Sequence, residues 1–287
     1  MWAYHGGFGI SRTWRGIRLA EGLGMRLTSI LLLGSSLVAC MRGGSIDGVD
    51  TAESAIDNSD SVSAEGDVMA ANVDGATTVG LAALTGDQVA IAIAANIAAK
   101  WPNGCAQVTQ TGANLAVVYN DCTGPRGLVH VTGTLDLAIS VGAGGAIAIH
   151  GTATDFQVNN ATLQIDADAI YTTTGTQRSL AVTSHGTGIG PRGNDIDHQG
   201  MYTLTWDPTS SCGSIVGHWQ TDISNATGSA QRSNDVDLSK CVAACPTGTL
   251  THHFLGGASV TVTFDGTATA SWSASTGRSG TVALACR

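Results

Sequence analysis

Apolar and polar residues alternate at a period of two through most of the chain after residue 104. The alternation is clearest at 115–119, 135–139, 202–206 and 259–264. It predicts antiparallel strands that have one buried face and one solvent-facing face. Glycine-containing turns separate these segments at a spacing of roughly 8–12 residues, which favours consecutive hairpins. The pattern therefore predicts an all-β fold built on an antiparallel meander, in the form of a curved sheet, a sandwich or a half-barrel.

The remaining strands are predicted from shorter runs of the same kind. The first two, at 105–110 and 114–120, are joined by Thr111-Gly112-Ala113 and form a hairpin. The others are expected at 128–132, 147–149, 156–158, 163–165, 180–183, 267–272 and 281–285.

One N-terminal, Ala-rich helix is predicted at 87–100, packed on one face of the sheet. Val89, Ile93 and Ile97 recur four residues apart and therefore fall on one helical stripe. We expect Asp87 to cap the N-terminus of this helix, because a side-chain oxygen accepts from the free backbone amides there. Pro102 is expected to end the helix.

The segment from Met25 to Cys40 has the order of a secretion signal. A positive start is followed by apolar residues up to Ala39, too few to span a bilayer, which needs about 20. The last four residues, Leu37-Val38-Ala39-Cys40, resemble the lipobox of bacterial lipoproteins. That resemblance implies cleavage before Cys40 and acylation of its thiol and its new amino group. Met41, not Asp, follows Cys40, which by the same resemblance implies the outer membrane, on its periplasmic or surface face.

Four segments are therefore predicted along the chain. Residues 1–24 are interpreted as an over-extended start, and 25–39 as the signal peptide. Residues 40–66 form an acidic tether that is predicted to be flexible, because it has too few large apolar residues to order itself. Residues 67–287 are expected to form a single disulfide-stabilised β-domain.

Cysteine usage supports an oxidising compartment. Six cysteines follow Cys40, and an even number in an exported chain indicates disulfides; they are Cys105, Cys122, Cys212, Cys241, Cys245 and Cys286. Cys105 and Cys122 lie at the open end of the first hairpin and are predicted to pair. The other four leave three pairings open. Zinc binding by Cys241 and Cys245 is a disfavoured alternative.

The balance of charge excludes nucleic acid as a partner. The whole chain has a formal net charge of −9, and residues 1–39 remove four arginines but only one glutamate from the mature protein. The mature surface is therefore more acidic still. Binding to a phosphate backbone requires clustered Lys and Arg, and no basic run occurs.

Three arginines recur after strands and next to glycines: Arg126, Arg192 and Arg278. The first two lie in the repeated motif Gly-Pro-Arg-Gly. Three guanidinium groups together would bind a carboxylate or phosphate, whereas separately each would hydrogen-bond within its own turn. We favour the turn-tying role.

Paired aspartates offer a candidate calcium site. Asp195 with Asp197 and Asp235 with Asp237 occur in the motif Asn-Asp-Ile/Val-Asp, and Asp166 with Asp168 has the same spacing. In loops, such oxygens can bind calcium. On strands, residues two apart share the solvent face. The strand arrangement is favoured.

Catalytic motifs are missing from the sequence. No Gly-x-Ser-x-Gly elbow occurs, and the histidines are scattered without a metal-binding spacing. They are interpreted as solvated or hydrogen-bonded sheet residues. No catalytic residue and no cofactor is predicted.

The region 25–287 resembles a loosely defined group of uncharacterised bacterial lipoproteins. The shared features are the lipobox, the low-complexity tether and a Thr/Gly-rich β-domain with paired cysteines and Gly-Pro-Arg-Gly turns. The resemblance implies the fold and the envelope location only. We expect a non-enzymatic binding or structural module, held at the membrane by its lipid, with a protein, glycan or lipid partner. A hydrolase using Asp carboxylates and a lipid carrier with a concave apolar sheet are the alternatives.

The variant Cys40→Ala is expected to release the protein into the soluble periplasmic fraction or to block its processing, because the acceptor of the acyl chains is lost. Membrane fractionation and the size of the product on a gel measure this. A Cys40→Ala protein of wild-type size that still fractionates with membranes would contradict the lipoprotein assignment.

Overall fold

The computed structural model describes residues 84–284, except 102–103, 124–129, 159–160, 191–192, 208, 211, 227, 242–243 and 255. The predicted over-extended start, signal peptide and tether lie outside the described residues. So do Cys40, Arg126, Arg192 and Cys286.

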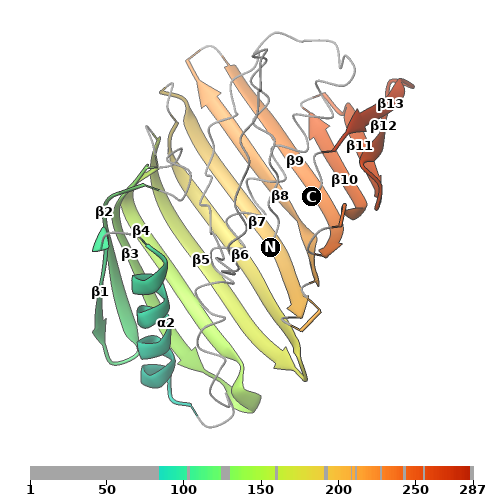
Figure 1. Ribbon diagram of the computed structural model, residues 1–287. Coiled ribbons are helices and arrows are strands. Elements are labelled where there is room, and N and C mark those ends of the chain that lie inside the picture. Colours follow the sequence, from blue (N-terminus) through green and yellow to red (C-terminus); the bar gives the residue numbers. More distant parts are fainter. Residues whose placement is uncertain are drawn as a thin grey trace, which may run out of the picture.

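The described strands form one 13-stranded sheet in which strand order follows chain order (Figure 1). Every neighbouring pair is antiparallel, so the predicted all-β meander is confirmed. The sheet is open and curved, with β1 and β13 as its edges. The strands are β1 (Ala106–Thr111), β2 (Asn114–Thr123), β3 (His130–Val141), β4 (Ile147–Val158), β5 (Ala161–Thr174), β6 (Gln177–Ile189), β7 (Asp195–Asp207), β8 (Cys212–Asn225), β9 (Gly228–Cys241), β10 (Thr247–Phe254), β11 (Ser259–Asp265), β12 (Thr269–Ala274) and β13 (Ser279–Ala283).

The helix α2 (Gly86–Lys100) packs across β1, β2 and β3 on one side of the sheet (Figure 1). Val89, Ile93 and Ile97 are buried, which confirms the predicted apolar stripe. The predicted cap is wrong. Thr85 is the N-cap, and its side chain and that of Gln88 form a reciprocal capping box. Asp87 lies in the first turn instead, where its charge favours the helix dipole.

The alternation of side chains gives the sheet two different faces. The helix face, on which α2 packs, carries rows of apolar residues that continue across the strands. One such row pairs Ile139 with Ile149 and continues through Ala169, Val182, Tyr202, Gly217, Val236, Leu250, Val262 and Trp272. All of its members except Gly217 are buried apolar residues. The opposite face, here the open face, carries exposed residues such as His150 and Asp168.

Two glycines on the helix face lie too close to aromatic residues of this row to carry a side chain. A Cβ on Gly217 would lie 2.4 Å from Cβ of Tyr202, and a Cβ on Gly280 would lie 2.9 Å from Cζ2 of Trp272. Both distances are shorter than any contact that real Cβ atoms make. Gly217 therefore allows β8 to approach the backbone of Tyr202 closely, and Gly280 leaves room for the ring of Trp272.

Bulges join strands that the sequence pattern separates. The described residues of the predicted strands 128–132 and 135–139 belong to one strand, β3, which begins at His130, and 147–149 and 156–158 belong to β4. The register of these two strands shifts between Thr132 and Leu135, opposite Asp155, whose φ is +54°. A bulge inserts an extra residue and breaks the period of two, so each strand looks like two in the sequence.

Three strands lie where the sequence predicts none: the long strands β8 and β9, and the shorter β10. The strands β8 and β9 contain several Gly, Asn and Asp residues, which are depleted in strands generally. Their helix-face positions include Thr221, Arg232 and Asn234, so the apolar alternation is broken. Pairing along the full length of both neighbours holds them in the sheet.

Disulfides link neighbouring strands and confirm the framework. Cys105 pairs with Cys122, as predicted, and Cys212 pairs with Cys241, which lies directly opposite in the β8–β9 register. Cys245 is also disulfide-bonded. Because Cys241 and Cys245 are both oxidised, neither offers a thiolate for the zinc alternative.

Packing of α2 predicts different costs for two isoleucines on the same helix. Ile93 is 1% exposed and Ile91 is 56% exposed. Ile93→Ala is expected to lower the free energy of unfolding by about 2–5 kcal/mol, because it leaves a cavity under the helix. Ile91→Ala, the matched control, is expected to change it by less than about 0.5 kcal/mol. Urea unfolding measures both, and equal losses would contradict this packing.

Candidate functional site: the open face and its histidine–aspartate pairs

Charge is divided between the two faces of the sheet. The aspartates of the central strands share the open face: Asp136, Asp166, Asp168, Asp197, Asp222, Asp235 and Asp237. The cations of the described strands, Arg178, Arg232 and Lys240, occupy helix-face positions. Because successive side chains point to opposite faces, this division follows directly from the register. The open face is therefore acidic.

Four histidines on the open face are each hydrogen-bonded to an aspartate on a neighbouring or nearby strand. His150 Nδ1 lies 2.9 Å from Asp168 Oδ1, and His185 Nε2 lies 3.1 Å from Asp197 Oδ1. Asp235 bonds two imidazoles, with His218 at 2.8 Å and His253 at 2.9 Å, one on each carboxylate oxygen. The histidines that are scattered in sequence therefore form a set of histidine–aspartate pairs.

Asp235 is held ionised by its two partners. Partial burial raises the pKa of this carboxyl, but the hydrogen bonds and charges of His218 and His253 outweigh it and keep the pKa below its usual range. The carboxylate consequently orients both rings at neutral pH.

His150 belongs to a group of three metal-ligand side chains. It lies directly opposite Asp168 in the β4–β5 register, and Asp166 is two residues away on the same face. The distance from His150 Nδ1 to Asp166 Oδ1 is 3.9 Å, and the ligand atoms of all three residues lie within 4.8 Å of one another. Among the described residues, this is the only such group.

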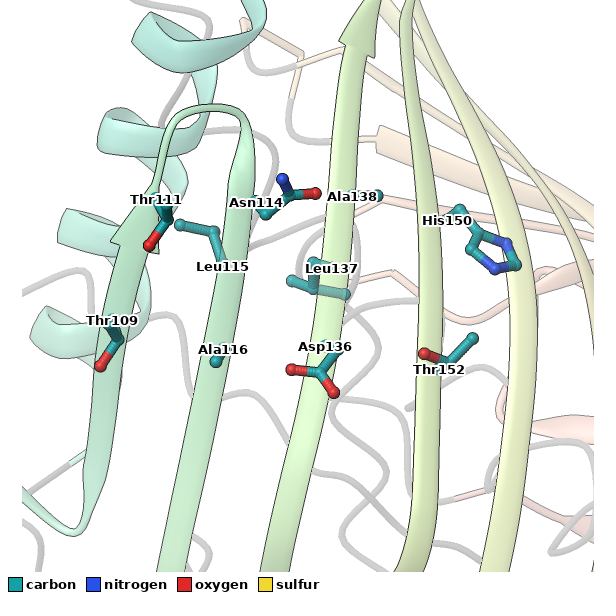
Figure 2. A pocket seen from close by; sticks show the side chains of 10 residues that line it. All are labelled: Thr109, Thr111, Asn114, Leu115, Ala116, Asp136, Leu137, Ala138, His150 and Thr152. Atoms are coloured by element: carbon teal, nitrogen blue, oxygen red, sulfur yellow. The ribbon is translucent and has the colours of Figure 1, made fainter.

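A hollow of about 320 Å³ adjoins this group on β1–β4. Figure 2 shows His150 and Thr152 along one side of it, Thr109 and Thr111 along the other, and Asp136 between them. Small side chains, Ala116 and Ala138, lie at its base. The remaining lining residues are Asn114, Leu115 and Leu137. His150 therefore belongs both to the hollow and to the three-residue group.

The chemistry of this arrangement favours ligation over nucleophilic catalysis. A carboxylate-oriented imidazole can transfer protons, but hydrolysis by a triad requires a nucleophile bonded to the ring. Within the part of the chain that the structure describes, no Ser, Thr or Cys is hydrogen-bonded to His150. Its bonding partners are carboxylates, which are metal ligands.

The structure places the described candidates on strands and in one turn, and Arg126 and Arg192 lie outside the described residues. Asp195 and Asp197 lie on β7, and Asp235 and Asp237 on β9, so the calcium hypothesis lacks the loops that it assumed. These pairs share the open face, as the favoured alternative predicts. Arg278 is exposed in the β12–β13 turn, where its carbonyl accepts from the amide of Ala274 at 2.8 Å.

The pairs were missed because the register was unknown. His150 and Asp168 are 18 residues apart in sequence. Whether these two side chains lie opposite each other depends on the turn between β4 and β5 and on the bulge in β4. The sequence pattern located neither feature. The sequence feature that pointed to this site is the Asp-x-Asp spacing, because it places Asp166 and Asp168 on one face of a strand.

The helix face contains a second, buried histidine pair. His252 Nδ1 lies 2.7 Å from Asn234 Oδ1, and both residues are almost fully buried. Burial, with the charges of Arg232 and His253, lowers the pKa of His252 to about 4. His198, bonded to Thr221 at 2.8 Å, also has a lowered pKa, mainly because of burial. Both rings are therefore neutral at physiological pH.

Comparison with protein-family models, curated proteins and solved structures finds no match. The resemblance to bacterial lipoproteins accordingly stays a prediction. Within the described residues, no helix has the length and apolar character needed to cross a membrane.

Protonation of His252 is expected to weaken the fold in acid. Its folded pKa of about 4 lies below the unfolded value of 6.5, so the unfolded chain binds the proton first as the pH falls. The free energy of unfolding should drop by about 2 kcal/mol between pH 7 and pH 5 through this group alone. In His252→Gln that part of the drop should vanish. Urea unfolding at both pH values tests this. An equal drop in the free energy of unfolding in wild type and in His252→Gln would contradict it.

Proposed function

We propose that the protein is an envelope lipoprotein, anchored through Cys40 in the outer membrane, whose β-domain is a non-enzymatic binding module. We further propose that its open face binds a divalent transition-metal ion. The observation that carries this is the group His150, Asp166 and Asp168 beside the hollow. The lipobox supports the location, and the described structure supports the binding surface.

The spacing of the three side chains suits a small divalent ion. Ligand atoms about 2.1 Å from a tetrahedral ion lie about 3.4 Å from one another. The distances from His150 Nδ1 to the nearest oxygens of Asp168 and Asp166 are 2.9 and 3.9 Å, on either side of that value. Small side-chain rotations would therefore bring the three atoms to a common ion. All three residues are exposed, so further positions are open to water or ligand.

The donor set selects the class of ion. One imidazole nitrogen with two carboxylate oxygens suits zinc, manganese, cobalt or nickel, whereas calcium prefers a cage of oxygens. The other aspartates of the open face create a negative potential that attracts cations to it. The same potential repels nucleic acid and anionic ligands from this side.

The alternatives fit the described residues less well. A lipid carrier requires an exposed apolar face, but the large helix-face side chains such as Tyr171, Leu180 and Leu250 are fully buried. A glycan site commonly stacks the sugar on aromatic rings, yet Trp101, Trp219 and Trp272 are buried in the core. For a hydrolase using Asp carboxylates, Asp168 is already hydrogen-bonded to His150 and Asp166 lies beside it, an arrangement that suits metal ligation.

Isothermal titration of the untagged protein with zinc tests the proposal. Wild type should bind one zinc ion, and His150→Ala and Asp166→Asn should each weaken binding by at least about tenfold, because each removes one ligand. Affinity should also fall as the pH falls, since imidazole must be deprotonated to ligate. His185→Ala is the matched control, because it removes a paired histidine of the same face that belongs to no three-ligand group.

The proposal fails if wild type binds no zinc, or if His185→Ala and His150→Ala weaken binding equally. Circular dichroism of each variant establishes that the sheet is intact. A wild-type spectrum with lost binding then assigns the loss to the ligand.

A further inference from the structure

Arg232 is an uncompensated cation on the helix face. It lies on β9, is half-buried, and has no hydrogen bond or ion pair within the described chain. Burial lowers the pKa of its guanidinium. No described aspartate occupies a regular helix-face position, so the strands themselves offer no counter-charge. A charge removed from water without a partner is costly, which indicates that an anion belongs there.

The register places Phe254 of β10 directly opposite Arg232 on one side and neutral polar groups on the other. Thr221 lies directly opposite on β8, His198 is opposite Thr221 on β7, and Gly186 is opposite His198 on β6. Among the described residues, a Cβ on Gly186 would meet only the carbonyl oxygen of Gln164, at 3.7 Å, an ordinary van der Waals contact. On this side of Arg232 the row consequently combines one cation, polar side chains and a glycine.

Two buried donors in the adjacent row have no partner among the described residues. Ser184 is 8% exposed and Trp219 is 1% exposed, and neither Ser184 Oγ nor Trp219 Nε1 has a hydrogen bond in this part of the chain. Ser184 Oγ and His198 Nε2 would lie 3.1 and 3.6 Å from a Cβ on Gly200, so both groups border the space above this glycine. A buried donor that has no protein partner can bond an acceptor atom of a ligand that reaches it.

We infer that the helix face of β6–β9 binds a small organic oxyanion, a carboxylate or a phosphate ester. Its charged group contacts Arg232, which can bind either oxyanion through two parallel hydrogen bonds. Ser184 lies three strands away, roughly 14 Å at the usual strand spacing, so one oxyanion cannot reach both residues. The ligand therefore extends along His198 and places an acceptor at Ser184. This site lies on the opposite face from the proposed metal site and is independent of it.

Three probes separate the requirements of the site: inorganic phosphate, glycerol 3-phosphate and succinate. Calorimetric titration of the full chain should show binding of glycerol 3-phosphate or succinate, each of which has an oxyanion and a second polar group. Arg232→Gln should weaken that binding at least tenfold, and Arg232→Lys should fall between it and wild type, because Lys keeps the charge but loses the paired hydrogen bonds. Ser184→Ala should weaken the extended probe but not inorganic phosphate.

Arg278→Gln is the control for loss of a surface charge, and it should bind as wild type does. Zinc titration of Arg232→Gln at the open face reports whether the sheet is intact, and it should be unchanged. The inference is overturned if no probe binds wild type, or if Arg232→Gln binds as tightly as wild type. A loss of binding equal in Arg278→Gln and Arg232→Gln would also overturn it, because that result indicates general attraction to positive charge.

Discussion

The continuous antiparallel register of the sheet is the constraint on which the rest of the structure depends. Each strand pairs with its neighbours in sequence, so no crossover interrupts the row of side chains that passes from β3 to β13. Because the side-chain period is two, one choice of register assigns every residue of a strand to a face. Packing of α2 on β1–β3 and the disulfide between Cys212 and Cys241 hold that choice at separate places.

This register turns a weakly patterned sequence into two chemically distinct surfaces. Asp166, Asp168 and Asp235 meet histidines of other strands on the open face. Arg232 lies on the other face, where carboxylates are absent among the described strand positions and neighbouring donors are buried. Among the described residues, the aspartates of the open face and the cations of the helix face therefore do not form ion pairs with one another. The separation explains why a single sheet can offer a cation site on one side and an anion site on the other.

Local irregularities shape the surfaces without breaking the register. The bulges of β3 and β4 lie beside one another, where the ring of Phe156 packs close to Gly133. Beyond them the strands resume their pairing, and His150 comes opposite Asp168. The small residues Ala116 and Ala138 leave a hollow next to that pair (Figure 2). The arrangement of the candidate site therefore depends on backbone geometry as much as on the identity of the ligands.

The sequence by itself determined the fold class, the first hairpin with its disulfide, and the buried stripe of the helix. These follow from local periodicity, from the turn residues 111–113 and from the spacing of Cys105 and Cys122, which need no distant information. Only the tertiary structure decided that β8 and β9 are strands, since Arg232 and Asn234 interrupt their apolar pattern. It also decided the pairing of the histidines with the aspartates. Contacts between residues 12 to 18 positions apart depend on strand lengths and bulges, and a shift of one residue would move each side chain to the other face.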